Sequence, residues 1–176
     1  MVALDRHVER WVVHHRAGWL DPVFVALTHA GSYGAVWVAL ALVAAWRSRR
    51  LQVLVLVVLA DLAAEGIADV LKAAIPRRRP PLVYPRPKPL VHDPHSHAFP
   101  SGHSTTSFAC ATMLALSYPR LAPAFYVLAA AIAYSRVYVG VHWPGDVVAG
   151  ALLGIAIALL LRAASRSQSW RGRRAG

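Results

Sequence analysis

Five apolar stretches constrain the fold of this chain more than any other feature of its sequence. A helix needs about 20 mainly apolar residues to cross the hydrocarbon core of a bilayer. Mean hydropathy is +0.44, and 57% of the residues are hydrophobic, which exceeds the share of about 45–50% in soluble domains. We therefore expect an all-α integral membrane bundle of about five transmembrane helices, at residues 34–46 (longer if 23–27 belongs to it), 51–75, 104–118, 121–138 and 146–161.

Two of these stretches carry signs of close helix packing. Residues 104–118 form a short stretch that contains serine and threonine, so we expect it to contact other helices more than lipid. Gly150 and Gly154 have the spacing of two small residues on one helix face, which favours packing within the chain over dimerisation.

Three flanking segments complete a single expected domain over residues 1–165. Residues 1–17 place apolar side chains at helical spacing opposite a charged face, which predicts an amphipathic helix in place of a first span. This pattern fits a helix at the membrane interface and a helix that caps the bundle equally well. Residues 76–100 hold most of the chain's prolines and predict a loop outside the hydrocarbon. Residues 166–176 are basic and polar, which predicts a disordered tail.

The net charge of +11 comes mainly from arginines that lie between the apolar stretches. This placement favours a membrane surface or an anionic substrate and argues against a nucleic-acid partner. If the spans alternate, residues 47–50, Arg120 and the tail arginines share one membrane face. Lysine and arginine close to span ends favour the cytoplasm. We therefore expect a multi-pass cell-membrane protein whose other face is extracytoplasmic, although the basic residues are divided almost evenly between the two.

Three polar clusters fall at that second face, although they are far apart in the sequence. The first is Lys72 with Arg79-Pro80, at the end of the stretch 51–75 and in the loop that follows it. The second is the run from Pro100 to His103, which opens the stretch 104–118. The third bridges the last two stretches. The expected topology thus gathers the following residues at one end of the bundle: Lys72, Arg79, Ser101, Gly102, His103, Arg136, His142 and Asp146.

These residue types suit the transfer of a phosphoryl group. Fixed cations stabilise the negative charge that spreads over the phosphoryl oxygens, and the candidates are Lys72, Arg79 and Arg136. Backbone N–H groups of Ser101 and Gly102 at a helix start would add an anion site. An imidazole can attack phosphorus while a carboxylate fixes its tautomer, and Asp146 follows His142 by one helical turn. His103 would protonate the leaving oxygen.

Together the three clusters resemble the three-part signature of the type 2 phosphatidic acid phosphatase superfamily, over roughly residues 20–162. The resemblance implies that His142 is the nucleophile, Asp146 its partner and His103 the general acid. Lys72, Arg79, Ser101, Gly102 and Arg136 would hold the phosphate. It implies no metal ion and no other cofactor. The expected activity is hydrolysis of a lipid phosphomonoester or pyrophosphate through a phosphohistidine, with undecaprenyl pyrophosphate, phosphatidylglycerol phosphate and phosphatidic acid among the candidates.

Several alternatives stay open at this level. A non-catalytic protein that binds or transports lipid phosphates could use the same basic pocket. Asp61, Glu65 and Asp69 recur along one face of the stretch 51–75, where we expect a structural role, with Asp69 orienting Lys72. Three histidines of the proline-rich loop could bind zinc, but a solvated loop is the favoured interpretation: His92, His95 and His97. The sequence selects neither the individual lipid nor the oligomeric state.

Overall fold

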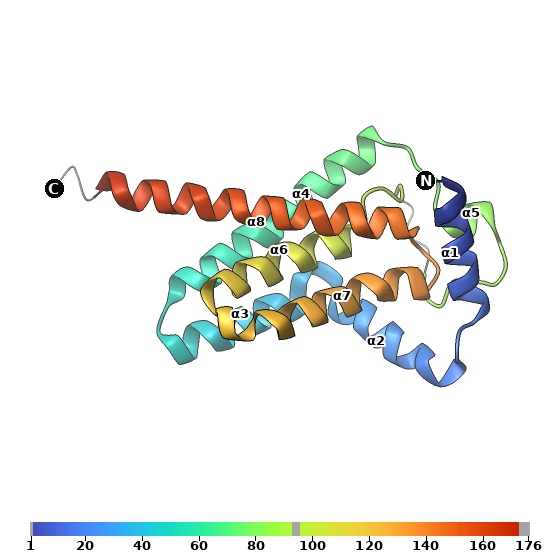
Figure 1. The fold of residues 1–176 in the computed structure, drawn as a ribbon, viewed down its shortest axis with the longest axis horizontal. Helices are drawn as coiled ribbons and strands as arrows, with labels where there is room; N and C mark the ends of the chain where they lie inside the picture. Colours follow the sequence, from blue (N-terminus) through green and yellow to red (C-terminus); the bar gives the residue numbers. More distant parts are fainter. Residues whose placement is uncertain (1, 93–95, 173–176) are drawn as a thin grey trace.

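The computed structural model describes residues 2–92 and 96–172, and every regular element in these residues is a helix, as the sequence predicts. Figure 1 shows an elongated bundle with α1 lying across one end, beside the loop that carries α5. The elements in chain order are α1 (Val2–His14), η1 (Gly18–Leu20), α2 (Asp21–Ala30), η2 (Ser32–Gly34), α3 (Ala35–Ser48), α4 (Leu51–Ala74), α5 (Pro80–Val83), α6 (Gly102–Ser117), η3 (Pro119–Leu121), α7 (Ala122–Tyr138) and α8 (Pro144–Gly172).

Helix α6 lies at the centre of the bundle, in contact with α4, α7 and α8. Its first half buries small polar side chains, including Ser104, Thr105 and Ser107, so the prediction that this stretch packs against helices is confirmed. A Cβ on Gly154 of α8 would lie 2.2 Å from the Thr105 carbonyl oxygen. The backbones of α6 and α8 can therefore approach only because this position lacks a side chain, which confirms the predicted packing within the chain.

The first expected stretch, residues 34–46, lies almost entirely in α3, and a bend separates it from residues 23–27 in α2. Helices α2 and α3 meet at a 65° bend, because Tyr33 and Gly34 both adopt left-handed backbone angles, with φ of 52° and 63°. The break lies at the end of the bundle where the polar clusters converge, and η2 lines the cavity described below.

Two helices among the described residues are long and apolar enough to cross a membrane, Pro119–Tyr138 and Pro144–Arg166. The bent pair Gly18–Ala30 and Ser32–Ser48 adds a third if it forms one broken span. Large apolar side chains point outward from the bundle, including Leu59 on α4 and Leu152 on α8. This surface is typical of a protein that contacts lipid, while the expected number of about five spans stays a prediction.

Both ends of the chain differ from the simplest expectation. Helix α8 continues to Gly172, so a helix replaces the disorder expected for residues 166–172, because no proline or glycine interrupts residues 163–171. Residues 173–176 lie outside the described part. Helix α1 buries Glu9 and Val13 against the bundle, so it is a packed cap, but it also leaves Leu4 and Trp11 exposed.

Candidate functional site

His142 lies in the short connection between α7 and α8 and is almost fully buried. Gly140 makes the turn possible with a φ of 81°, a value that side chains rarely allow. The Arg79 guanidinium donates to His142 Nε2 at 2.9 Å. A guanidinium can only donate, so Nε2 keeps its lone pair and the ring proton of the neutral imidazole lies on Nδ1. This tautomer is the one that a nucleophilic Nε2 requires.

Asp146, on the first turn of α8, faces the other nitrogen of that ring. Its Oδ2 lies 3.5 Å from His142 Nδ1, and the carboxylate is completely buried. The same oxygen accepts the Trp143 N–H at 3.0 Å. The contact with the imidazole is thus an electrostatic one, slightly longer than a hydrogen bond, and it favours the tautomer with the proton on Nδ1.

The surroundings keep His142 neutral. Burial lowers the pKa of its imidazole well below the ordinary value of 6.5, and the positive charges of Arg79 and Arg136 lower that pKa further. A neutral ring retains the lone pair that an imidazolium would lose, so the nucleophilic form prevails at neutral pH.

Two buried guanidiniums form the floor of the site. Arg79 is held from two sides: its Nε donates to the Ser96 carbonyl of the proline-rich loop at 2.7 Å, and its Nη1 donates to the Val141 carbonyl, between α7 and α8, at 3.0 Å. Arg136, in the last turn of α7, donates from Nη1 to the Thr28 hydroxyl at 3.1 Å. Its Nε is buried and has no hydrogen-bond partner among the described residues, so one donor direction remains for an anion.

Lys72 reaches the site from the last turn of α4. Its Nζ forms a 2.7 Å ion pair with Asp69, which confirms the expected pairing. A Cβ on Gly102 would lie 3.2 Å from the same Nζ. The glycine therefore lets the lysine approach the start of α6 closely.

The start of α6 corrects one expectation. The Ser101 N–H donates to the Asp146 carbonyl at 3.0 Å, so this backbone group ties α6 to α8 and is not directed at an anion. Ser101 Oγ, in contrast, is buried without a hydrogen-bond partner among the described residues. His103 is fixed through Nε2, which lies 3.2 Å from the Thr28 carbonyl oxygen. A carbonyl only accepts, so Nε2 is the donor in this contact, and Nδ1 is the ring nitrogen that the contact does not use.

One cavity of about 210 Å³ brings these side chains together. Its volume is below the range of about 300–1,000 Å³ that is usual for whole small molecules, so it fits a headgroup and not a complete lipid. Six of the eight predicted residues line it, while Asp146 lies behind His142 and Ser101 is not part of the lining. The lining residues are Gly31, Ser32, Tyr33, Glu65, Lys72, Arg79, Ser96, Gly102, His103, Thr106, Arg136 and His142.

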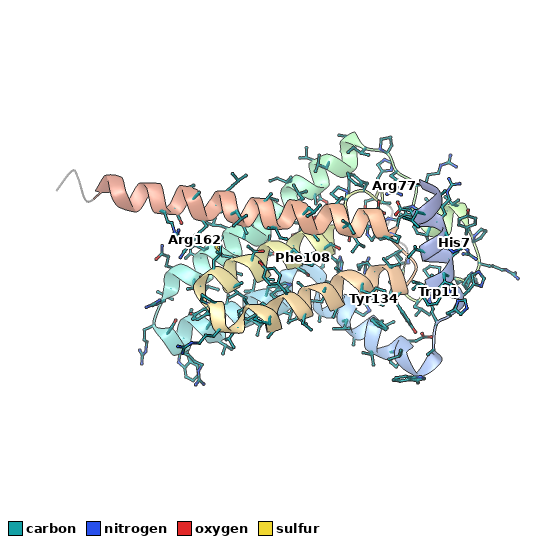
Figure 2. All side chains as sticks on the ribbon, in the orientation of Figure 1. His7, Trp11, Arg77, Phe108, Tyr134 and Arg162 are labelled. Atoms are coloured by element: carbon teal, nitrogen blue, oxygen red, sulfur yellow. The ribbon has the colours of Figure 1, made fainter. Side chains whose placement is uncertain are left out.

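Sequence reasoning missed Arg77, which supports the site from behind. Its Nη1 donates to Asp146 Oδ1 at 2.5 Å, and its Nη2 donates to Asp5 of α1 at 2.6 Å. Asp5 also accepts the Gly145 N–H at 2.9 Å. Figure 2 shows Arg77 between α1 and the start of α8. Nothing in the run of three arginines from Arg77 to Arg79 distinguishes this one by its sequence.

The remaining candidates divide between the site and the core. Glu65 lines the cavity, whereas Asp61 is buried deeper, where the Cys110 thiol points at it from 3.9 Å. His97 is exposed in the loop, and its carbonyl accepts from Arg79. No group of three potential metal ligands occurs within residues 2–92 and 96–172, and His95 lies outside them.

Comparisons with known proteins agree with this geometry. The sequence profile described as PAP2 superfamily matches residues 53–170. The bacitracin transport permease protein BcrC of Bacillus licheniformis is 32% identical over 81% of this chain and 70% of its own length. The decaprenylphosphoryl-5-phosphoribose phosphatase of Mycolicibacterium smegmatis is 39% identical over 71% of this chain and 68% of its own length.

Two solved structures share the fold. LpxE of Aquifex aeolicus superposes with a TM-score of 0.77 at 26% identity, over 89% of this chain and 93% of that one. A transmembrane PAP2-type phosphatidylglycerolphosphate phosphatase from Bacillus subtilis superposes with a TM-score of 0.73 at 28% identity, over 94% of this chain and 86% of that one.

Proposed function

Because the chain belongs to the PAP2 superfamily and is a membrane phosphatase of its lipid phosphatase group, we propose that it cleaves lipid phosphates through a phosphohistidine on His142. One observation carries this proposal: His142 Nε2 holds its lone pair in a cavity that is lined by three cationic side chains. Those cations are Lys72, Arg79 and Arg136.

The first half of the reaction forms a bond between His142 Nε2 and phosphorus. On binding, the phosphate takes over the Arg79 Nη1 that now donates to Nε2, which frees the lone pair for attack. As the N–P bond forms, the bond from phosphorus to the lipid oxygen breaks. His103 keeps its Nε2 proton on the Thr28 carbonyl, so it must take up a second proton on Nδ1 when the substrate binds, and it gives this proton to the leaving oxygen. Asp146 stabilises the positive charge that the His142 ring acquires.

The second half restores the enzyme. A water molecule attacks phosphorus, His103 takes its proton, and the N–P bond breaks to release inorganic phosphate. Throughout, Arg136 and Lys72 neutralise the charge on the phosphoryl oxygens, because fixed donors in a buried site lose no energy to reorganisation.

The substrate is a phosphate or pyrophosphate attached to a lipid. The cavity accepts only the headgroup, and the outward surface of the helices is apolar, so the lipid chain would remain in the bilayer. Relatives are named for decaprenylphosphoryl-5-phosphoribose and undecaprenyl diphosphate, and a structural neighbour for phosphatidylglycerol phosphate. We assign the site to the extracytoplasmic face, because Arg50 and Arg162 lie at the opposite end of the bundle.

The test is to trap the intermediate. Purified protein is mixed with a lipid phosphate labelled in its phosphorus, quenched within milliseconds, and assayed for acid-labile, alkali-stable phosphate on the chain. We expect this label on the wild type and none on His142→Ala. A panel of lipid mono- and diphosphates in detergent then ranks the substrates by phosphate release. Turnover by His142→Ala at the wild-type rate would refute the mechanism.

A transport or binding role is the second candidate, because one relative is named as a transport permease. A carrier needs the cationic cavity but not a nucleophile. If His142→Ala abolished phosphate release and left lipid-phosphate transfer between vesicles intact, the chain would be a carrier as well as a hydrolase.

A further inference from the structure

A second basic cavity lies at the other end of the bundle, remote from His142. It has a volume of about 230 Å³ and is formed by the start of α4, the end of α6 and Arg162 of α8, ten residues before that helix ends. Figure 2 shows Arg162 at this end and Arg77 at the other. The lining residues are Arg50, Gln52, Val53, Leu56, Leu116, Ser117 and Arg162.

The polar groups of this cavity are mostly donors. Arg162 Nε is buried and has no hydrogen-bond partner among the residues that the structure describes. The Ser117 hydroxyl donates to the Met113 carbonyl at 3.0 Å, so its proton is engaged. Arg50, Arg162 and the Gln52 amide therefore supply the donors. The positive end of the 24-residue helix α4 lies beside them and adds to the attraction for an anion.

Within residues 2–92 and 96–172, no acidic side chain lies at this end of the bundle. The sequence has no aspartate or glutamate in residues 22–60, 94–145 or 147–176, and every lining residue falls within these ranges. The acidic residue that follows Gln52 along α4 is Asp61, which is about 13 Å further up the helix at 1.5 Å per residue. That distance exceeds the Debye length of about 8 Å. The buried Nε of Arg162 therefore has no acidic side chain near it, and the exposed Arg50 adds a second positive charge beside it.

We propose that this cavity binds the phosphate of an anionic phospholipid in the leaflet opposite the His142 site. Val53, Leu56 and Leu116 form the rest of the lining. A free phosphate ion gains nothing from these apolar walls, whereas the glycerol and first methylenes of a phospholipid would bury against them. Basic pockets between transmembrane helices commonly bind such headgroups. This inference does not depend on the phosphatase mechanism.

The experiment measures lipid binding to the full chain in zwitterionic detergent micelles, with phosphatidylglycerol as the probe. A phosphodiester is used because it offers the His142 site no phosphomonoester to cleave. The test variant is R50Q/R162Q. The matched control is R47Q/R120Q, which removes the same charge from exposed arginines of the same end that do not line the cavity. Phosphatidylcholine and inorganic phosphate serve as comparison ligands.

We expect R50Q/R162Q to bind phosphatidylglycerol roughly 30-fold more weakly, which corresponds to about 1 kcal/mol per arginine, and the control to bind within threefold of wild type. Equal loss in both double variants would show diffuse attraction only and overturn the site. If wild type bound phosphatidylcholine as tightly as phosphatidylglycerol, the proposed anionic-lipid site would also be overturned. If inorganic phosphate bound R50Q/R162Q more weakly than wild type by the same factor as the lipid, the ligand would be free phosphate and the lipid assignment would be wrong.

Folding is checked by phosphate release from a short-chain substrate, which R50Q/R162Q should retain. If that variant fails to fold, Q52E places a carboxylate in the same cavity and keeps both arginines. We expect Q52E to lose the preference for phosphatidylglycerol while remaining active, and unchanged binding would refute the proposal.

Discussion

Replacing Arg77 tests whether the site depends on a residue that never touches the substrate. Arg77 is absent from the cavity lining, yet it donates to Asp146, the carboxylate behind His142. Arg77→Gln removes a charged hydrogen bond from a completely buried carboxylate. Asp146 then keeps the Trp143 N–H but loses the contact that fixes its second oxygen. We expect the imidazole to be less well oriented and kcat to fall.

The size of the effect follows from the geometry. A hydrogen bond to a charged group is worth about 1.5–3 kcal/mol. The 2.5 Å length favours the upper part of that range, and the 25% exposure of the Arg77 side chain favours the lower part. Since about 1.4 kcal/mol is tenfold in rate, kcat should fall by about 10–100-fold. Removing the carboxylate altogether should cost more, on the order of the 10⁴-fold known for a catalytic triad.

The assay is steady-state phosphate release together with the single-turnover rate of phosphohistidine formation. Because Arg77 does not contact substrate, KM should stay within about twofold while kcat falls. Arg77→Lys should recover part of the loss, and Asp5→Asn should cause a smaller one. Arg78→Gln is the matched control, since this neighbouring arginine is exposed. A raised KM with normal kcat would place Arg77 on the substrate and refute the reasoning.

Three further predictions concern the cavity and the helix packing that supports it. Arg136→Ala should lose about 3 kcal/mol of transition-state stabilisation, as for the loss of one oxyanion donor, so that kcat/KM falls roughly 150-fold. A near-normal kcat/KM would exclude a contact between Arg136 and the phosphate. Arg79→Gln removes a charge that lowers the pKa of His142, and the pKa of His142 should therefore rise. The acid limb of the pH profile of kcat/KM should then move to higher pH than in wild type with the same substrate. An unmoved limb would mean that His142 does not set it. Gly154→Ala would put a Cβ 2.2 Å from the Thr105 carbonyl oxygen and should cost about 2 kcal/mol, or a Tm lower by about 4–8 °C. Gly66→Ala, which meets nothing within 4 Å, should leave Tm unchanged or raised.

The sequence predicted the convergence of the polar clusters because membrane topology leaves few alternatives. Lys72 lies near the end of one expected span and His103 at the start of the next. Because successive spans run in opposite directions, both residues lie at one end of the bundle. The chemistry of the side chains then identifies the cavity. The sequence could not predict which backbone groups are already occupied, so the Ser101 N–H was expected to face an anion and instead binds the Asp146 carbonyl. That contact depends on how closely α6 and α8 approach.

The supporting residues escaped prediction for a related reason. Thr28 anchors Arg136 through its hydroxyl, and Ser96 anchors Arg79 through both its carbonyl and its hydroxyl. Such groups occur throughout any sequence. The bend between α2 and α3 has a local cause in Gly34, but its angle depends on packing against α4, where a Cβ at Gly34 would overlap the Asp61 carboxylate at 2.1 Å. A supporting residue of a common type can therefore be identified only once its position in the fold is known.

The role of α1 explains how the site forms without a clear first transmembrane span. Asp5 holds Arg77 and the Gly145 N–H, while Arg16 donates to the Tyr138 carbonyl at 2.7 Å, just before the His142 turn. Helix α1 and Arg16, two residues beyond its end, thereby contact both sides of the connection between α7 and α8. Its exposed Leu4 and Trp11 are suited to the membrane interface. The two interpretations of this segment are thus compatible, because one face of the helix caps the site while another remains available to lipid.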